Sequence, residues 1–132
     1  VIAQGTRNRR GLELCAALDR NVAVLRDTDK QSPEYWKDKA RQWLESGKRE
    51  MFVGDPDFGA TLEPQVAKTN AGNDYEMRLR KIVECPENEN LEEFMTGDKT
   101  GWAWRVTSAA ESDRIKYPTY ITDAIEFVTR AM

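Results

Sequence analysis

A short apolar run that ends in two acidic residues constrains the fold of this chain more than any other feature. Residues 22–25 read Val-Ala-Val-Leu, and after one arginine they are followed by Asp27-Thr28-Asp29. A continuous, partly β-branched apolar run is typical of a parallel strand that is covered on both faces. In open α/β sheets, ligands bind at the carboxyl ends of such strands. We therefore expect a parallel sheet with a polar site where this strand ends.

Asp27 and Asp29 are candidate ligands of a divalent metal ion. If the chain stays extended, alternate residues point the same way, so the two carboxylates converge. Their repulsion would be relieved by a hard cation such as Mg²⁺, which prefers oxygen ligands. The alternative interpretation is that both are ordinary turn or helix-capping residues at a strand end. The residues alone leave both interpretations open.

The remaining pattern predicts an α/β fold, with a parallel sheet flanked by helices and a mostly helical C-terminal part. At 132 residues the chain is long enough for one core, so we expect a single domain over residues 1–132. Trp36 and Trp43 share the apolar face of one predicted helix, and a core role is expected for both, with base stacking as the alternative. The predicted strands are residues 1–5, 22–25 and 50–53, and the main predicted helices are 11–19, 33–46, 61–69, 74–83, 91–95, 102–110 and 118–132.

Composition excludes several classes of function. The net charge is −3, so charge alone does not indicate nucleic-acid binding, although a local basic patch beside a metal could serve it. There is no histidine, and the two cysteines have no CxxC spacing, which argues against a zinc site. Any catalysis must then use carboxylates, lysine or a metal-activated water. The sequence has neither a membrane-spanning apolar run nor a signal peptide, so we expect no membrane association and a cytoplasmic location.

Two further residues complete a candidate catalytic set. Glu63 follows the third predicted strand, and Lys99 stands at the start of a later helix. Three acids and a lysine suit metal-assisted phosphoryl transfer, since the acids hold Mg²⁺ or Mn²⁺ and the lysine offsets charge on the phosphate. Taken singly, Glu63 could be an ordinary acid in a first helical turn and Lys99 a solvated lysine. Candidate contacts to a nucleic-acid backbone, each equally explicable as surface charge, are Arg7, Arg9, Arg10, Arg78 and Lys81.

The order of these motifs resembles a known family. Residues 22–29 are similar to the second motif of a Toprim domain, the metal-binding fold of topoisomerases, primases and several nucleases. The succession of Asp27-Thr28-Asp29, residues 52–55, Thr61-Leu62-Glu63, Gly97-Asp98-Lys99 and residues 117–125 resembles the Toprim half of OLD-family (overcoming lysogenization defect) nucleases. The resemblance spans essentially the whole chain.

Membership of that family would imply a divalent-metal-dependent DNA endonuclease or nickase, often used in defence against phage. Asp27, Asp29 and Glu63 would be metal ligands in a two-metal site, and Lys99 would be the catalytic lysine. The partners implied are DNA and an upstream ABC-type ATPase domain or subunit, which would bind ATP and mediate homo-oligomerisation. The family's first motif, a glutamate after an initial strand, is missing, so we expect a fragment of a longer protein that is inactive by itself.

Two other functions remain open from the sequence. Asp-x-Asp after a strand also resembles the nucleophile loop of haloacid-dehalogenase phosphatases, although no small hydroxyl follows Asp29 in the usual place. The other is a non-catalytic module that binds a metal or a partner. In that case the apolar stripe of residues 121–128 could dock the partner, although a core role is the expected one.

Overall fold

The computed structural model describes residues 2–4, 8–110 and 114–130, which form two compact units. Unit 1 consists of residues 1–61 and 118–132, and unit 2 of residues 62–117. The prediction that residues 1–132 fold as a single domain stays a prediction. Every helix in the described ranges is too short or too polar to span a lipid bilayer.

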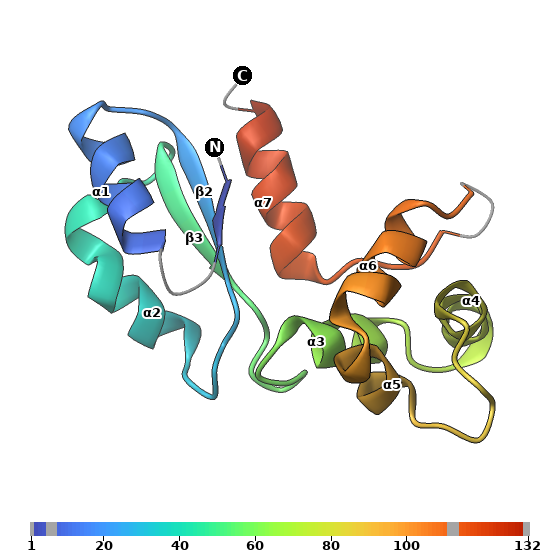
Figure 1. The fold of residues 1–132 in the computed structure, drawn as a ribbon. Coiled ribbons are helices and arrows are strands. Elements are labelled where there is room, and N and C mark those ends of the chain that lie inside the picture. Colours follow the sequence, from blue (N-terminus) through green and yellow to red (C-terminus); the bar gives the residue numbers. More distant parts are fainter. Residues whose placement is uncertain (1, 5–7, 111–113, 131–132) are drawn as a thin grey trace. The chain divides into compact units, whose positions relative to one another are not determined.

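Unit 1 is built around a parallel sheet, as expected. Its strands are β1 (Ile2–Gln4), β2 (Val22–Arg26) and β3 (Arg49–Val53), in the order β1-β2-β3. Ala23 pairs with Ile2 on one side and with Glu50 on the other, so β2 is the central strand (Figure 1). The predicted ends of β1 at positions 1 and 5 lie outside the described residues.

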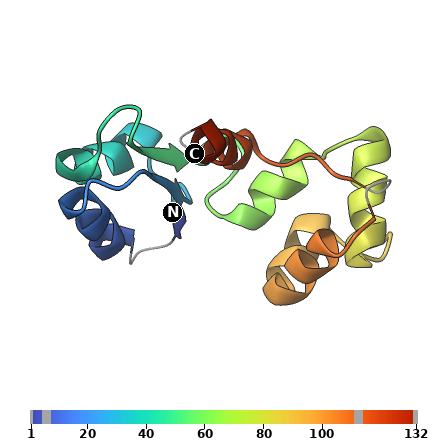
Figure 2. The same ribbon diagram turned by 90° about the horizontal axis from the view of Figure 1, so that it is seen from above.

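Helices cover both faces of this sheet, which explains the continuous apolar run in β2. Helices α1 (Asn8–Ala17) and α2 (Pro33–Ala40) lie on one face, and α7 (Thr119–Arg130) lies on the other (Figures 1 and 2). Val22 and Val24 belong to the core cluster that contains residues of α1 and α2. Ala23 points to the opposite face and is also fully buried. The burial of both faces confirms the type of strand predicted for residues 22–25.

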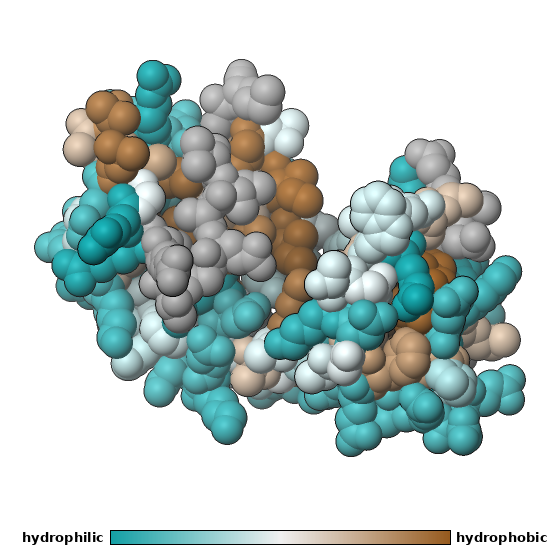
Figure 3. Space-filling model, in the orientation of Figure 1, coloured by the Kyte–Doolittle hydropathy of each residue, from teal (hydrophilic) through white to brown (hydrophobic). Residues whose placement is uncertain are grey.

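The apolar stripe of α7 is only partly covered. Ala124 is fully buried and Tyr120 is nearly so, and Phe127 packs against Phe52 of β3 at a ring-centroid distance of 5.7 Å. Ile125, however, is 52% exposed, and hydrophobic side chains along α7 are visible on the surface in Figure 3. The expected core role therefore holds for one side of the stripe, among the described residues.

Helix α2 ends earlier than its apolar pattern predicts. The expected helix over residues 33–46 stops at Ala40 and continues as a 3₁₀ turn, η1 (Arg41–Trp43). The chain then folds back through a bridge between Glu45 and Arg49, with Gly47 at φ +82° in the turn. Trp43 still packs against the same core as Trp36. In a 3₁₀ turn, residues three apart lie on the same side, so Trp43 stays on the side of the core residue Ala40.

The helices in the described residues of unit 2 are α3 (Leu62–Thr69), α4 (Asn73–Val83), α5 (Leu91–Gly97) and α6 (Lys99–Thr107). Their core is centred on Leu79, Val83, Met95 and Trp102. Sequence predicted a loop over residues 96–101, but Asp98 is the one residue that separates α5 from α6. All described elements after β3 are helices, as predicted for the C-terminal part. The α/β class is confirmed, while the likeness to a Toprim fold stays a prediction.

Candidate functional site

The segment Asp27-Thr28-Asp29 leaves the carboxyl end of the central strand β2 and is held in place by its middle residue. Thr28 is 1% exposed, and its hydroxyl donates a hydrogen bond to the carbonyl of Gly59 at 3.0 Å. Its own carbonyl accepts one from Trp36 Nε1 at 2.7 Å. The amide of Asp29 donates to the carbonyl of Ala60 at 3.1 Å. The loop is therefore tied both to α2 and to the loop that follows β3.

The chain does not stay extended through the two aspartates, which was the condition for their predicted convergence. Asp29 has φ +45° and Lys30 has φ +67°, so the chain leaves the extended conformation before alternation could aim both carboxylates in one direction. This corrects the geometric argument for convergence. Capping of α2 is not the role of either aspartate, because Ser32 caps that helix by accepting from the amide of Tyr35. Asp29 lies in a turn, as one of the two interpretations had it.

Asp27 and Asp29 differ in their surroundings. Asp27 is half-buried directly after β2. The side chain of Asp29 is 50% exposed and lies 3.4 Å from Nη2 of Arg26. The described part of the chain holds no group of three or more acidic or cysteine side chains that could surround a metal ion. Two carboxylates with water and substrate oxygens suffice for one Mg²⁺ ion, which usually takes one or two protein ligands.

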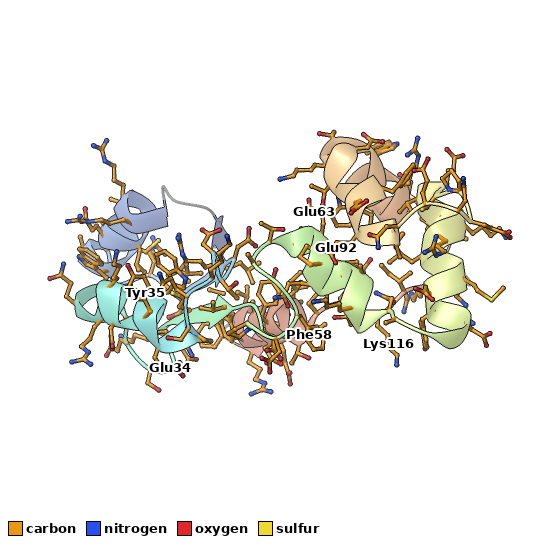
Figure 4. All side chains as sticks on the ribbon, turned by 90° about the horizontal axis from the view of Figure 1, so that it is seen from below. Glu34, Tyr35, Phe58, Glu63, Glu92 and Lys116 are labelled. Atoms are coloured by element: carbon orange, nitrogen blue, oxygen red, sulfur yellow. The ribbon has the colours of Figure 1, made fainter. Side chains whose placement is uncertain are left out.

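Glu63 is a buried carboxylate in the first turn of α3 (Figure 4). Glu63 is 5% exposed, and its Oε1 accepts a hydrogen bond from Nε1 of Trp102 at 3.4 Å. Acidic side chains are seldom this buried without a partner, and the indole supplies one here. The first-turn position agrees with the interpretation of Glu63 as an ordinary acid at a helix start. Such an acid is usually exposed to solvent, whereas Glu63 is buried.

Lys99 is the first residue of α6 and is exposed to solvent. The preceding Asp98 caps the helix by accepting from the amide of Gly101 at 3.2 Å, and it also pairs with Arg105 at 3.3 Å. The predicted set is thus divided: Asp27 and Asp29 belong to unit 1, whereas Glu63 and Lys99 belong to unit 2.

The cations predicted to contact a nucleic-acid backbone belong to both units. Arg9 pairs with Glu13 at 2.9 Å, and Arg78 stacks on Tyr75 with Cζ 5.1 Å from the ring centroid. Arg10 and Lys81 are exposed, and Arg7 lies outside the described residues.

Sequence reasoning missed Arg26, the last residue of β2. Arg26 is 8% exposed, and its Cζ lies 3.3 Å from the ring centroid of Trp36. The available signal was a charged residue that ends a buried strand, where a cation needs a local partner. Arg26 therefore contacts both Asp29 in the aspartate loop and Trp36 in the neighbouring core.

Two pKa shifts arise away from the aspartate loop. Hydrogen bonds from Lys48 and Arg49 lower the pKa of Asp19, which precedes β2. Burial raises the pKa of the Cys85 thiol in unit 2.

Comparison with known proteins gave no match, whether to protein-family models, to curated proteins or to solved structures. The Toprim and OLD-family resemblance therefore stays a prediction that rests on the motifs alone.

Proposed function

We propose that this chain supplies the Toprim-like part of a divalent-metal-dependent DNA endonuclease or nickase of the OLD type. The observation that carries the proposal is the Asp-Thr-Asp loop at the carboxyl end of the central parallel strand, with Thr28 buried between two acids. This is the edge of an open α/β sheet at which ligands bind. The buried threonine holds the loop, in which Asp29 is exposed and Asp27 is half-buried.

In this proposal, one Mg²⁺ or Mn²⁺ ion binds at the carboxyl end of β2. Asp27 and Asp29 would hold it, and binding at Asp29 would compete with the ion pair to Arg26, whose 3.4 Å separation is long for a strong contact. When bound, the ion would supply positive charge that offsets the negative charge developing on a phosphate. A second ion, with Glu63 as its ligand and Lys99 beside the leaving oxygen, rests on the resemblance.

The chain's own residues have defined tasks in this proposal. Thr28 and Trp36 hold the loop through hydrogen bonds of 3.0 and 2.7 Å. DNA is the substrate, and an upstream ABC-type ATPase is the expected partner. Antiphage defence follows from the same resemblance, and a cytoplasmic location is part of the same proposal.

The first test is Mn²⁺ binding to this chain, followed by the paramagnetic broadening of backbone NMR signals. Broadening should centre on residues 27–29 and should disappear in Asp27→Asn. Asp57→Asn is the matched control, because Asp57 is an exposed acid in the loop after the neighbouring strand β3. Broadening that persists in Asp27→Asn, or that Asp57→Asn removes equally, would refute the metal site.

The second test is plasmid nicking with Mg²⁺ or Mn²⁺ by the native protein that contains this chain, beside its Asp27→Ala and Glu63→Ala variants. Metal-dependent nicking that both variants lose would support the nuclease. Trapping of a phospho-aspartate analogue by beryllium fluoride, without nicking, would instead indicate the phosphatase. Metal binding with neither activity would indicate the non-catalytic module.

A further inference from the structure

A cavity lies in unit 1 between helices α1 and α2, over the face of the sheet opposite α7. Its volume is about 580 Å³. Cavities of this size accommodate small organic ligands. Its apolar wall includes Trp36, Trp43 and Met51, which come from α2, η1 and β3.

Among the described residues, the charged side chains that line this cavity are all cationic. Arg9 comes from α1, Arg26 from β2 and Lys39 from α2, and the described part of the lining includes no carboxylate. The acidic partners of the two arginines, Glu13 and Asp29, both lie outside the lining. A ligand inside would therefore meet positive charge and apolar surface together.

All three of these cations lie beside a tryptophan ring. Arg26 lies with Cζ 3.3 Å from the Trp36 ring centroid, and Arg9 lies with Cζ 5.1 Å from that of Trp43. The ammonium group of Lys39 is 5.6 Å from the Trp36 ring. Cation–π contacts hold a charge beside an aromatic surface without neutralising it. Arg26 is also almost fully buried, which fixes its guanidinium.

We propose that this cavity binds a small anion that carries a flat aromatic ring. The ring would pack against the indoles and Met51, and the anionic group would take charge-assisted hydrogen bonds from Arg26, Lys39 and Arg9. A phosphate on a nucleoside and a carboxylate on an aromatic acid share this chemistry. The proposal stands independently of the nuclease, since it requires neither a metal nor the aspartates.

Binding is tested on this chain by NMR of the tryptophan indole N–H signals, with 5′-AMP and 1-naphthoate as probes. Trp36 and Trp43 line the cavity, while the other two tryptophans, Trp102 and Trp104, belong to unit 2 and serve as internal references. As the probe is added, the indole signals of Trp36 and Trp43 should shift until binding saturates. The positions of the Trp102 and Trp104 signals should not change. Adenosine tests the need for charge, and inorganic phosphate tests the need for a ring.

The decisive variant is Lys39→Gln, and Lys37→Gln on the same helix is its control. Lys39 lines the cavity and Lys37 is an exposed residue outside the lining. Lys39→Gln should weaken the charged probes about fivefold, as expected for one partly exposed charge-assisted contact. Lys37→Gln should leave the affinity unchanged. Both chains should keep the wild-type indole spectrum before ligand is added.

Each outcome decides the proposal. The proposal is supported if either charged probe binds saturably and the binding depends on Lys39. The probe that binds then shows whether the ligand is a nucleotide or an aromatic acid. It is overturned if neither probe shifts Trp36 and Trp43, or if adenosine or phosphate alone binds as tightly. Equal weakening in Lys37→Gln would also overturn it, since that would indicate general electrostatic attraction.

Discussion

Replacement of Thr28 by valine should destabilise unit 1 and loosen the aspartate loop. The hydroxyl of Thr28 is buried and donates to the carbonyl of Gly59 at 3.0 Å. Valine has nearly the same shape but cannot donate, so the part-buried carbonyl of Gly59 loses this hydrogen bond. We expect the free energy of unfolding to fall by about 1–3 kcal/mol.

Serine at the same position separates the hydrogen bond from packing. Thr28→Ser keeps the hydroxyl and removes one buried methyl, at a cost of about 1 kcal/mol. The valine variant should therefore be no more stable than the serine variant. Thr100→Val is the surface control, because Thr100 is exposed on α6, and its effect should stay within about 0.5 kcal/mol.

Urea denaturation followed by tryptophan fluorescence measures these differences, provided that the m-values agree. The reasoning would be refuted if Thr28→Val kept wild-type stability while Thr28→Ser lost it, since packing alone would then hold the loop. A valine variant that unfolds earlier should also show weaker Mn²⁺ broadening at residues 27–29, because the loop is less well fixed.

Two further predictions concern unit 2. The buried Asn70 donates to the carbonyl and accepts from the amide of Lys116, each at 2.7 Å, so Asn70→Ala should lower the free energy of unfolding by about 2–4 kcal/mol in the same urea experiment. Asn70→Asp should cost at least as much, because it replaces the donating amide group with a buried carboxylate oxygen that faces the carbonyls of Val66 and Lys116. Cys85 is buried and its thiol pKa is raised, so at pH 8 iodoacetamide should alkylate Cys15 before Cys85, as read by mass spectrometry, and alkylation of Cys85 should accelerate at higher pH as its thiolate forms. Prior labelling of Cys85 in the folded chain would show that its burial is transient.

The pattern of residues along the chain was enough to predict the class of fold and the position of the aspartate loop. The run at residues 22–25 is apolar on both sides because both faces of β2 are covered, and that requirement is local enough to be visible in sequence. The amphipathic stripes of α1 and α7 were likewise readable, since each buries one face against a neighbour. Element ends were less accurate, as the early stop of α2 shows.

Tertiary structure decided what surrounds each charge. The left-handed backbone at Asp29 depends on the turn that joins β2 to α2, and no periodicity in the sequence encodes it. The burial of Arg26 over Trp36 needs a strand end and a helix ten residues apart to meet in space. The bond from Trp102 to Glu63 likewise joins two separate helices. Local patterns specify which residues face a core, but the partners of a buried charge are chosen when the elements pack.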